Sequence, residues 1–410
     1  MIVTVNVKTS TKISTRLDAP TCADARNAGG AARAGLNVRR RPPVPSVARP
    51  ATVLRAVRGI IALIVLLAAA VAVGGCQGFD GGKPSASART GFALGTFVQV
   101  RAYASGGPAD EAVEEAMARI REVEALMSVN VPSSDVAAVN RESGGLPTEV
   151  AEDTLYVVKK AVEYGDLSGG KFDVAIGPLV QLWGIGTDHA RVPAPSEIEA
   201  ARSLVDYRGV ELDESASTVR LKKPGMAIDL GAIAKGFAAD EAAETLVERG
   251  VRSAFIDLGG NILVVGSKPD GSPWRVGIQD PWKERGATFA VVPVRDSAVV
   301  SSGTYERFFE QDGKRYHHII DPDTGYPAET GIVSATVLAR RAVDADALST
   351  TVFLLGPSEG MKLIAGLPGV EAVIVTDDRQ VVASPGLRGV IEVNKGWAVK
   401  FYGLENVQEG

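Results

Sequence analysis

From Gly91 onward, short apolar runs alternate with amphipathic segments, and this alternation constrains the fold more than any other feature of the chain. Runs rich in Val, Ile, Leu and Phe predict β-strands. Apolar residues spaced three or four apart predict helices that bury one face. No Pro- or Ser-rich linker divides residues 91–405, so we expect one compact domain, of one or two lobes. The predicted fold class is α/β or α+β, with mixed sheets flanked by helices.

The boundaries of the expected elements follow from these patterns. Strands are expected at residues 92–104, 253–258, 261–266, 287–294, 332–339 and 371–377. Helices are expected at 108–127, 151–164, from about 231 to 250, and at 343–356; Gly250 and Gly356 are typical helix stops. The segment "DLGGN" at 257–261 lacks the third glycine of a dinucleotide fingerprint, which argues against a Rossmann site.

The N-terminal part of the chain has the features of a secretory leader. Arg55 and Arg58 precede a 14-residue apolar run from Ile60 to Val73, and small residues follow it. A positive flank, a short apolar core and a small-residue exit are typical of a signal peptide, whereas a spanning helix needs roughly 20 apolar residues. We therefore predict that residues 1–75 are a leader, with its apolar core at about 59–75. An uncleaved anchor helix is the alternative that remains open.

The end of this leader, "VGGC", resembles the bacterial lipobox, in which the cysteine receives a lipid and becomes the first mature residue. The resemblance implies lipidation of Cys76 and an extracytoplasmic protein anchored to a bacterial membrane. The Gly- and Ser-rich residues that follow Cys76 predict a flexible linker over residues 76–90. Cys22 is the only other cysteine and would leave with the leader. The mature chain would then have no thiol pair for a disulfide.

Charge is distributed unevenly along the chain. Residues 1–75 carry 11 Lys and Arg against 2 Asp and Glu, and the remainder carries 33 against 47, a net charge of −14. An acidic body repels phosphate backbones, so we exclude nucleic acid as a partner. Any phosphate-bearing ligand would need a metal ion or a local cluster of donors.

Two polar residues in the last expected helix form a candidate metal site. Asp346 and Thr350 are four residues apart, so their side chains share one helix face. A carboxylate and a hydroxyl suit a hard cation such as Mg²⁺. Alternatively, Asp346 is solvated in the first turn and Thr350 bonds back to a carbonyl.

Two glycine-containing segments could approach a ligand. In "AIDLGAIAKGFAAD" at 227–240, Asp229 and Lys235 lie near an expected helix start, where free N–H groups favour anions. Helix capping by Asp229 beside a solvated Lys235 is the alternative. The segment 167–186 holds five glycines around Phe172, Asp173 and Trp183. A flat ligand could stack there, and a plain turn packed on a core tryptophan would look similar.

The adjacent histidines in "RYHHIIDPDTG" raise a separate question. On a strand, His317 and His318 would point to opposite faces, so they cannot easily share a metal ion. One of them could act as a general base toward a hydroxyl, because histidine titrates near neutral pH. A structural role is the alternative for each.

Taken together, the motifs closely resemble the ApbE-type FAD:protein FMN transferases from about Gly91 to residue 400. They are "GTFVQV", "MSVNVPSSDVAAVNR", "GGKFDVAIGPLVQLWG", "IDLGAIAKGFAAD", "DLGGN", "SSGTYERFFEQDGKRYHHIIDPDTGYP" and "DADALSTTVFLLG". The resemblance implies an Mg²⁺-dependent enzyme that splits FAD at its pyrophosphate, transfers FMN to a threonine hydroxyl of another protein, and releases AMP. A membrane-bound acceptor would suit a lipid-anchored enzyme.

The resemblance also implies roles for individual residues. Mg²⁺ would be bound by the backbone carbonyl of Ala232 and by the side chains of Asp346 and Thr350, with Ser349 adjacent. His318 would help to deprotonate the acceptor threonine, leaving His317 a bystander. Flavin and phosphate contacts would come from Leu94, Asn130, Lys171, Phe172, Asp173, Asp229, Lys235 and Ile320.

Two other functions fit the same pocket. A pyrophosphatase would cleave FAD to FMN and AMP with water as the nucleophile, using the same residues. A flavin-binding lipoprotein without turnover would need neither the histidine nor the metal ligands. The presence of His318, Asp346 and Thr350 favours an enzyme.

Overall fold

A computed structural model describes residues 85–104, 109–404 and 407–409, and these residues belong to one compact unit. The predicted leader, Cys76 and the first part of the predicted linker lie outside the described residues. Within the described ranges, no helix is both long and apolar enough to cross a membrane.

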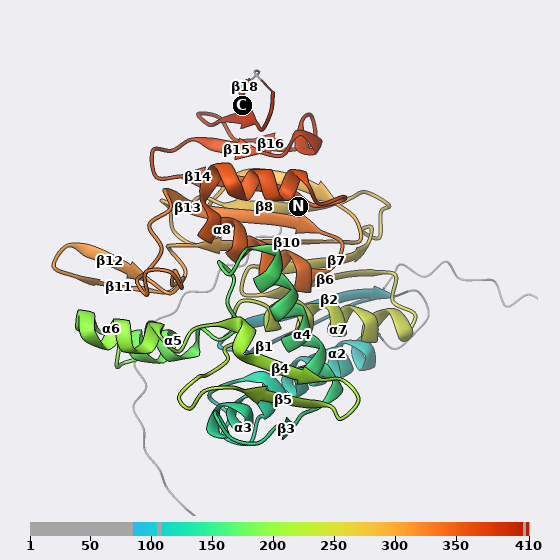
Figure 1. The fold of residues 1–410 in the computed structure, drawn as a ribbon. Helices are drawn as coiled ribbons and strands as arrows, with labels where there is room; N and C mark the ends of the chain where they lie inside the picture. The colour runs from blue at the N-terminus through green and yellow to red at the C-terminus, as the bar shows by residue number, and fades with distance from the viewer. Residues whose placement is uncertain (1–84, 105–108, 405–406, 410) are drawn as a thin grey trace, which may run out of the picture. The chain divides into compact units, whose positions relative to one another are not determined.

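A ten-stranded sheet forms the centre of this unit (Figure 1). All neighbouring strands are antiparallel except the pair β15–β17, which is parallel. In spatial order the strands are β1 (Ser85–Ala93), β2 (Thr96–Ala104), β6 (Ser253–Leu258), β7 (Asn261–Gly266), β10 (Ser297–Gly303), β13 (Ile332–Ala339), β14 (Glu371–Thr376), β15 (Val381–Ala383), β17 (Ala398–Phe401) and β18 (Val407–Glu409).

Helices and three smaller sheets complete the described part. The helices are α2 (Ala109–Met127), α3 (Asp135–Arg141), α4 (Glu152–Leu167), α5 (Gly177–Trp183), α6 (Pro195–Arg202), α7 (Ala234–Glu248) and α8 (Ala342–Ala365). The smaller sheets have the orders β16 (Glu392–Val393), β9 (Thr288–Val294), β8 (Trp274–Gln279); β3 (Thr148–Glu149), β5 (Thr218–Leu221), β4 (Val210–Asp213); and β11 (Phe308–Gln311), β12 (Lys314–His317). The predicted class, mixed sheets flanked by helices, is confirmed.

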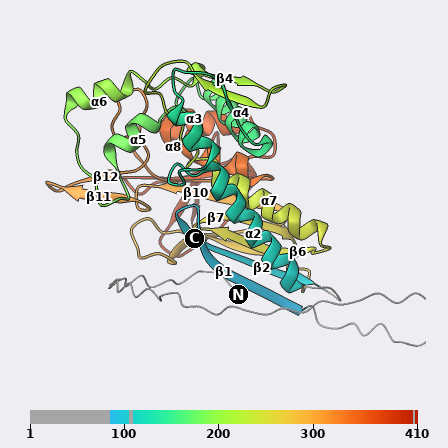
Figure 2. The same cartoon turned by 90° about the horizontal axis from the view of Figure 1, so that it is seen from below.

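The central strands of the large sheet, β6, β7, β10, β13 and β14, are buried on both faces, which explains why they read as nearly continuous apolar runs. On one face the sheet packs against α2, α7 and α8, two of which, α2 and α7, lie side by side in Figure 2. On the other face it packs against the sheet of β8 and β9. Alternate residues of one strand therefore enter different cores: Ile256 faces the helices and Phe255 faces the small sheet.

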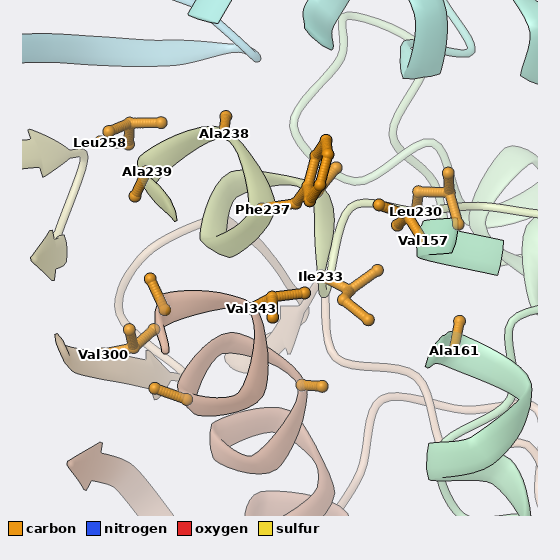
Figure 3. Close-up of a cluster of buried hydrophobic side chains, with 14 of the residues drawn as sticks. Val157, Ala161, Leu230, Ile233, Phe237, Ala238, Ala239, Leu258, Val300 and Val343 are labelled. Atoms are coloured by element: carbon orange, nitrogen blue, oxygen red, sulfur yellow. The ribbon is translucent and has the colours of Figure 1, made fainter. Parts of the chain in front are cut away.

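The helical core holds α7 tightly against its neighbours. Figure 3 shows Ile233 and Phe237 between Val343 of α8 and Val157 of α4. All four side chains are at most 3% exposed. Burial of side chains of this size contributes about 1.5–3 kcal/mol each, so the position of α7 relative to α8 is fixed by the core.

The N-terminal boundary of the domain differs from the prediction. The expected strand 92–104 is a hairpin of β1 and β2, because Leu94 and Gly95 both have positive φ and form its two-residue turn. Strand β1 pairs with β2 from Ser85 onward, so the predicted linker 76–90 is wrong for residues 85–90. Strand β1 lies at the edge of the sheet. Small polar residues are tolerated there, so its sequence lacks the apolar pattern that predicts a strand.

The start of α7 and the end of α8 both differ from the predicted helix boundaries. Helix α7 begins at Ala234, later than expected, because the Asp229 carboxylate accepts a hydrogen bond from the Gly231 N–H in a preceding turn (2.8 Å). Asp229 therefore does not cap the helix. Gly356 interrupts α8 with φ 81° and ψ 173°, as its predicted stop requires, and a further helical segment follows it.

Candidate functional site

A close contact between α7 and α8 brings the candidate metal residues together. A Cβ atom at Gly236 would lie 2.2 Å from the carbonyl oxygen of Ala342, so a residue with a side chain cannot be accommodated without displacing backbone. This approach allows the Gly236 N–H to donate to Oδ2 of Asp346 at 2.9 Å. The carboxylate is thereby fixed at the first turn of α7, where helix N–H groups favour negative charge.

Asp346 is buried, and its other oxygen faces a cation. The residue is 3% exposed, and Oδ1 lies 3.6 Å from Nζ of Lys235. The Lys235 ammonium also donates to the carbonyl oxygen of Gly231 at 2.7 Å. The alternative in which Asp346 is solvated is therefore wrong. A positive group already lies between this carboxylate and the turn that carries Ala232.

Hydroxyl groups line the same part of α8. Oγ of Ser302, on β10, lies 2.8 Å from Oγ of Ser349 and 3.1 Å from Oγ1 of Thr350. Ser349 donates in turn to the carbonyl oxygen of Asp346 at 2.9 Å. Thr350 does not bond back to its own helix, whereas Thr351 does, to Ala347 at 2.8 Å. The alternative for Thr350 is therefore also wrong.

We define the cation cradle as Ala232, Asp346, Ser349 and Thr350, together with Ser302. Among the residues that the structure describes, no group of three or more His, Cys, Asp or Glu side chains could hold a metal ion. The cradle instead offers one buried carboxylate, hydroxyls and a backbone carbonyl in the turn before α7. This donor set fits Mg²⁺, which is commonly held by one or two carboxylates and completes its shell with water and substrate phosphates.

His318 lies at the base of the β11–β12 hairpin, opposite Arg307. Its backbone N–H donates to the carbonyl oxygen of Arg307 at 3.1 Å, and its Nδ1 lies 3.3 Å from the same oxygen. A carbonyl oxygen can only accept, so Nδ1 carries the proton and Nε2 keeps a free lone pair. Nε2 is therefore the atom that can accept a proton.

Burial lowers the pKa of His318 to about 3, and the positive charges of Arg307 and Lys235 add to this effect. His318 is consequently neutral at physiological pH, in the form that a general base requires. Because Arg307 and Lys235 both influence His318, the hairpin base and the cation cradle share one electrostatic environment. A bound anion would raise the pKa again and strengthen the base.

His317 has a packing role. It is 6% exposed, its Nε2 lies 3.0 Å from the carbonyl oxygen of Ala328, and its Nδ1 accepts from the Ile319 N–H at 3.3 Å. The ring also contacts Phe353 edge to face, with centroids 5.5 Å apart. Both nitrogens are thus satisfied within the fold.

Part of the predicted flavin set lies near these charges. Leu94 occupies the β1–β2 turn, where its N–H donates to Glu124 at 2.7 Å, and the next carbonyl, that of Gly95, accepts from Nη2 of Arg307 at 3.1 Å. Burial raises the pKa of Asp229, while the charges of Lys235 and Arg307 oppose this rise. Leu94, Asp229 and Lys235 therefore surround the same region as Arg307.

Lys171, Phe172 and Asp173 have structural partners. Lys171 forms ion pairs with Asp321 at 3.0 Å and Asp323 at 2.8 Å, which tie its loop to the segment after His318. The Asp173 carboxylate accepts from the N–H groups of Ala175 and Tyr207, and burial raises its pKa to about 6. Phe172 is 4% exposed in the core, so its ring is not available for stacking on a ligand.

Asn130 and Ile320 contribute neither to the cradle nor to the hairpin base. Asn130 is exposed, and its N–H donates to Oγ of Ser128 at 3.2 Å. Ile320 is 5% exposed in a separate small core with Leu179 and Trp183. Among the residues that the structure describes, no hydrogen bond, ion pair or ring contact joins either side chain to Asp346 or His318.

The structure adds three residues that pattern reasoning did not single out: Gly236, Ser302 and Arg307. Gly236 and Ser302 lie inside quoted motifs, but neither spacing nor periodicity distinguishes them from their neighbours. Arg307 follows a loop after β10, so its approach to Gly95 depends on a contact between residues 212 positions apart. Only the tertiary fold reveals it.

Comparison with known proteins gives a consistent result. Residues 94–374 match the ApbE family. A Treponema pallidum protein named FAD:protein FMN transferase is 40% identical over 339 residues, which cover 79% of this chain and 93% of that protein. The crystal structure of the Thermotoga maritima ApbE protein aligns with a TM-score of 0.70 and 32% identity, over 75% of this chain and 99% of that one. The flavin transferase ApbE from Vibrio cholerae aligns with a TM-score of 0.68, 30% identity and the same coverage.

Proposed function

The chain belongs to the ApbE family and is an FAD:protein FMN transferase, and we propose that it uses Mg²⁺ and a threonine hydroxyl as the acceptor. In this reaction the threonine oxygen forms a bond to the phosphorus of the FMN half of FAD. The bond from that phosphorus to the bridging oxygen of the pyrophosphate breaks, and AMP leaves. The hydroxyl proton passes to Nε2 of His318.

The cradle residues would hold the metal ion: Asp346 and Thr350 by side-chain oxygens, Ala232 by its carbonyl, and Ser349 beside them. When bound, Mg²⁺ would neutralise the pyrophosphate and stabilise the charge that develops on the leaving AMP. Lys235, 3.6 Å from Asp346, supplies a second positive charge in the same place. These charges matter because the chain after residue 75 has a net charge of −14.

One observation carries this proposal. A buried carboxylate and a threonine hydroxyl one helical turn apart lie beside a lysine whose charge also reaches a neutral histidine. Phosphoryl transfer depends on positioning and charge neutralisation, and little covalent chemistry is required of the protein. The arrangement provides both, together with a proton acceptor for the attacking hydroxyl.

The test uses the full chain, FAD and MgCl₂, with a membrane extract from cells lacking the enzyme as the source of acceptor. We expect flavin fluorescence on a protein band in a denaturing gel, equal amounts of AMP and bound FMN, and loss of both with EDTA. Mass spectrometry of the fluorescent band would locate the FMN on a threonine. Free FMN and AMP without a fluorescent band would show a pyrophosphatase instead.

We also propose that Cys76 carries a lipid that anchors the enzyme on the extracytoplasmic side of a bacterial membrane. The sequence supports this through the leader and the small residues before the cysteine. A tether would raise the local concentration of a membrane-bound acceptor. Replacement Cys76→Ser should abolish incorporation of labelled fatty acid and release the protein from the membrane fraction. Unchanged membrane retention of unlabelled protein would support the anchor-helix alternative.

A further inference from the structure

The β11–β12 hairpin differs from every other sheet in the described part because it has only two strands. It extends to one side of the large sheet in both views (Figures 1 and 2). Its turn, Asp312 and Gly313, has φ values of 53° and 75°, which is typical of a two-residue type I′ turn. Its two strands begin and end at the candidate site: β11 follows Arg307, and β12 leads into His318.

The hydrogen-bond pattern shows which backbone groups of the hairpin are used. Arg307 and His318 form a hydrogen-bonded pair, and antiparallel strands alternate bonded and non-bonded pairs. Phe309 and Tyr316 are then bonded to each other, whereas Phe308 and Glu310 direct their N–H and C=O groups away from β12. The outer edge of β11 therefore offers two unpaired donors and two unpaired acceptors.

The two outer edges of the hairpin are not equivalent. On the β12 side, Lys314 forms an ion pair with Glu329 at 2.6 Å, and His317 contacts the carbonyl oxygen of Ala328. Among the described residues, the outward backbone groups have no backbone partner on either edge, but on the β11 side no residue outside the hairpin forms a hydrogen bond or ion pair with Phe308 or Glu310. Phe308 is also 39% exposed. The free edge is thus the β11 edge, next to Arg307.

We propose that the threonine-bearing segment of the acceptor protein adds as an extended strand to the free edge of β11. The inference rests on the proposed function, because it names how that acceptor reaches the site. Strand addition uses main-chain hydrogen bonds for affinity and can therefore accept varied sequences. Neighbouring strands lie about 4.8 Å apart, so a segment paired with Phe308 and Glu310 ends beside Arg307. His318 lies on the other side of Arg307, about two strand spacings away, so the threonine would follow the paired segment and cross the base of the hairpin to reach it.

The small size of this edge suits a substrate that must leave after one transfer. Four residues of β11 give an interface well below the roughly 1,200 Å² of stable complexes. The exposed ring of Phe308, with Arg315 4.0 Å from its centroid, adds an apolar contact beside the edge. We therefore expect the edge to affect the KM for the acceptor and to leave FAD binding unchanged.

The first test compares Glu310→Pro with Glu310→Ala in the full chain. Both variants lose the exposed ion pair with Arg315, but only proline removes the outward N–H, without breaking a bond to β12. We expect kcat/KM for the acceptor identified in the transfer assay to fall about tenfold in Glu310→Pro relative to Glu310→Ala. FAD binding, measured by quenching of flavin fluorescence, should be equal in the two variants. Equal kcat/KM for the acceptor would overturn the inference while leaving the transferase function intact.

A second test keeps the wild-type chain, so it also decides the matter if Glu310→Pro fails to bind FAD. A peptide of about ten residues around the flavinylated threonine competes with the whole acceptor. Two versions of this peptide carry backbone N-methyl groups on alternate residues, one on the odd-numbered positions and the other on the even-numbered positions; we call these the two phases. Strand addition predicts that one phase abolishes competition and the other retains it, because only every second N–H faces the edge. Equal competition by both phases would overturn the proposal, whereas absence of any transfer by the wild-type chain would contradict the function itself.

Discussion

The cation cradle and the hairpin base would serve two halves of the proposed reaction, and they differ in how the fold holds them. Asp346, Ser349 and Gly236 lie on helices whose other faces form the main core. His318 follows a two-stranded sheet whose tip, residues 310–315, is exposed. The groups that would handle the pyrophosphate are thus fixed by global packing, and the group that would handle the acceptor is on a peripheral element.

This difference has a physical consequence. Two-stranded hairpins are marginally stable alone and open more easily than core helices. The stacked rings of Phe309 and Tyr316, 5.2 Å apart, join the two strands of the hairpin, and the contact of Tyr316 with Trp183 and the Lys171–Asp321 ion pair attach it to the rest of the fold. We infer that the acceptor side of the site can adjust to a protein partner while the cradle keeps its geometry.

The largest effect is expected from removing the cradle carboxylate. Replacement Asp346→Ala should reduce the transfer rate about 10³-fold or more, because metal charge stabilisation contributes several kcal/mol. It should also lower the free energy of unfolding by about 1–3 kcal/mol, since the buried Gly236 N–H loses its acceptor. Transfer assays and thermal unfolding measure the two effects separately.

Asp344 provides the matched control for this variant. It lies on the same helix, but its carboxylate accepts from the Tyr164 hydroxyl at 2.7 Å, outside the cradle. Replacement Asp344→Asn should leave the Mg²⁺ dependence of transfer unchanged. A parental transfer rate for Asp346→Ala at saturating Mg²⁺ would show that the cradle has no part in the reaction. The contrast between a rigid metal site and a peripheral acceptor site would then be wrong.

The adjacent histidines test the other side. Replacement His318→Gln should lower the transfer rate about 10²-fold, as expected for loss of a general base, with little change in stability. Replacement His317→Gln should do the opposite, because His317 is buried and contacts Ala328 and Phe353. Rates and melting temperatures measured on both variants check this reversal. Equal losses of activity would show that the hairpin base acts as one rigid unit.

The two regions also differ in how far the sequence predicted them. Helical spacing placed Asp346 and Thr350 on one face, because a helix is a local structure with a fixed period. The strands at 253–258 and 332–339 were correct to the residue, since burial on both faces leaves mostly apolar residues there. The hairpin and the β1 edge strand escaped prediction because their polar outer residues carry no such signal. Arg307 and Ser302 acquire their roles only through contacts between distant segments.

A smaller effect is expected at Ser302, whose hydroxyl joins β10 to Ser349 and Thr350 of the cradle. Replacement Ser302→Ala should raise the Mg²⁺ concentration for half-maximal transfer about tenfold, as found for residues that orient metal ligands. Ser301 is the control, because its hydroxyl bonds to Thr336 instead, at 2.8 Å. The same shift in Ser301→Ala would indicate a general effect on β10 and would weaken the claim that the cradle is tuned locally.

The smallest effect concerns the pKa of His318, which joins the two regions electrostatically. Burial is the main cause of its low value of about 3, and Arg307 is the next. Replacement Arg307→Met removes a positive charge that opposes protonation, so the pKa should rise, and an imidazole NMR titration of the free enzyme would measure it. The base form exists above the pKa, so the acid limb of kcat/KM should move to higher pH in this variant.

Arg315→Met is the control, because Arg315 is exposed and paired with Glu310. If Arg307→Met leaves the titration unchanged, burial alone keeps His318 neutral, and the hairpin base would then act independently of the charges around the cradle.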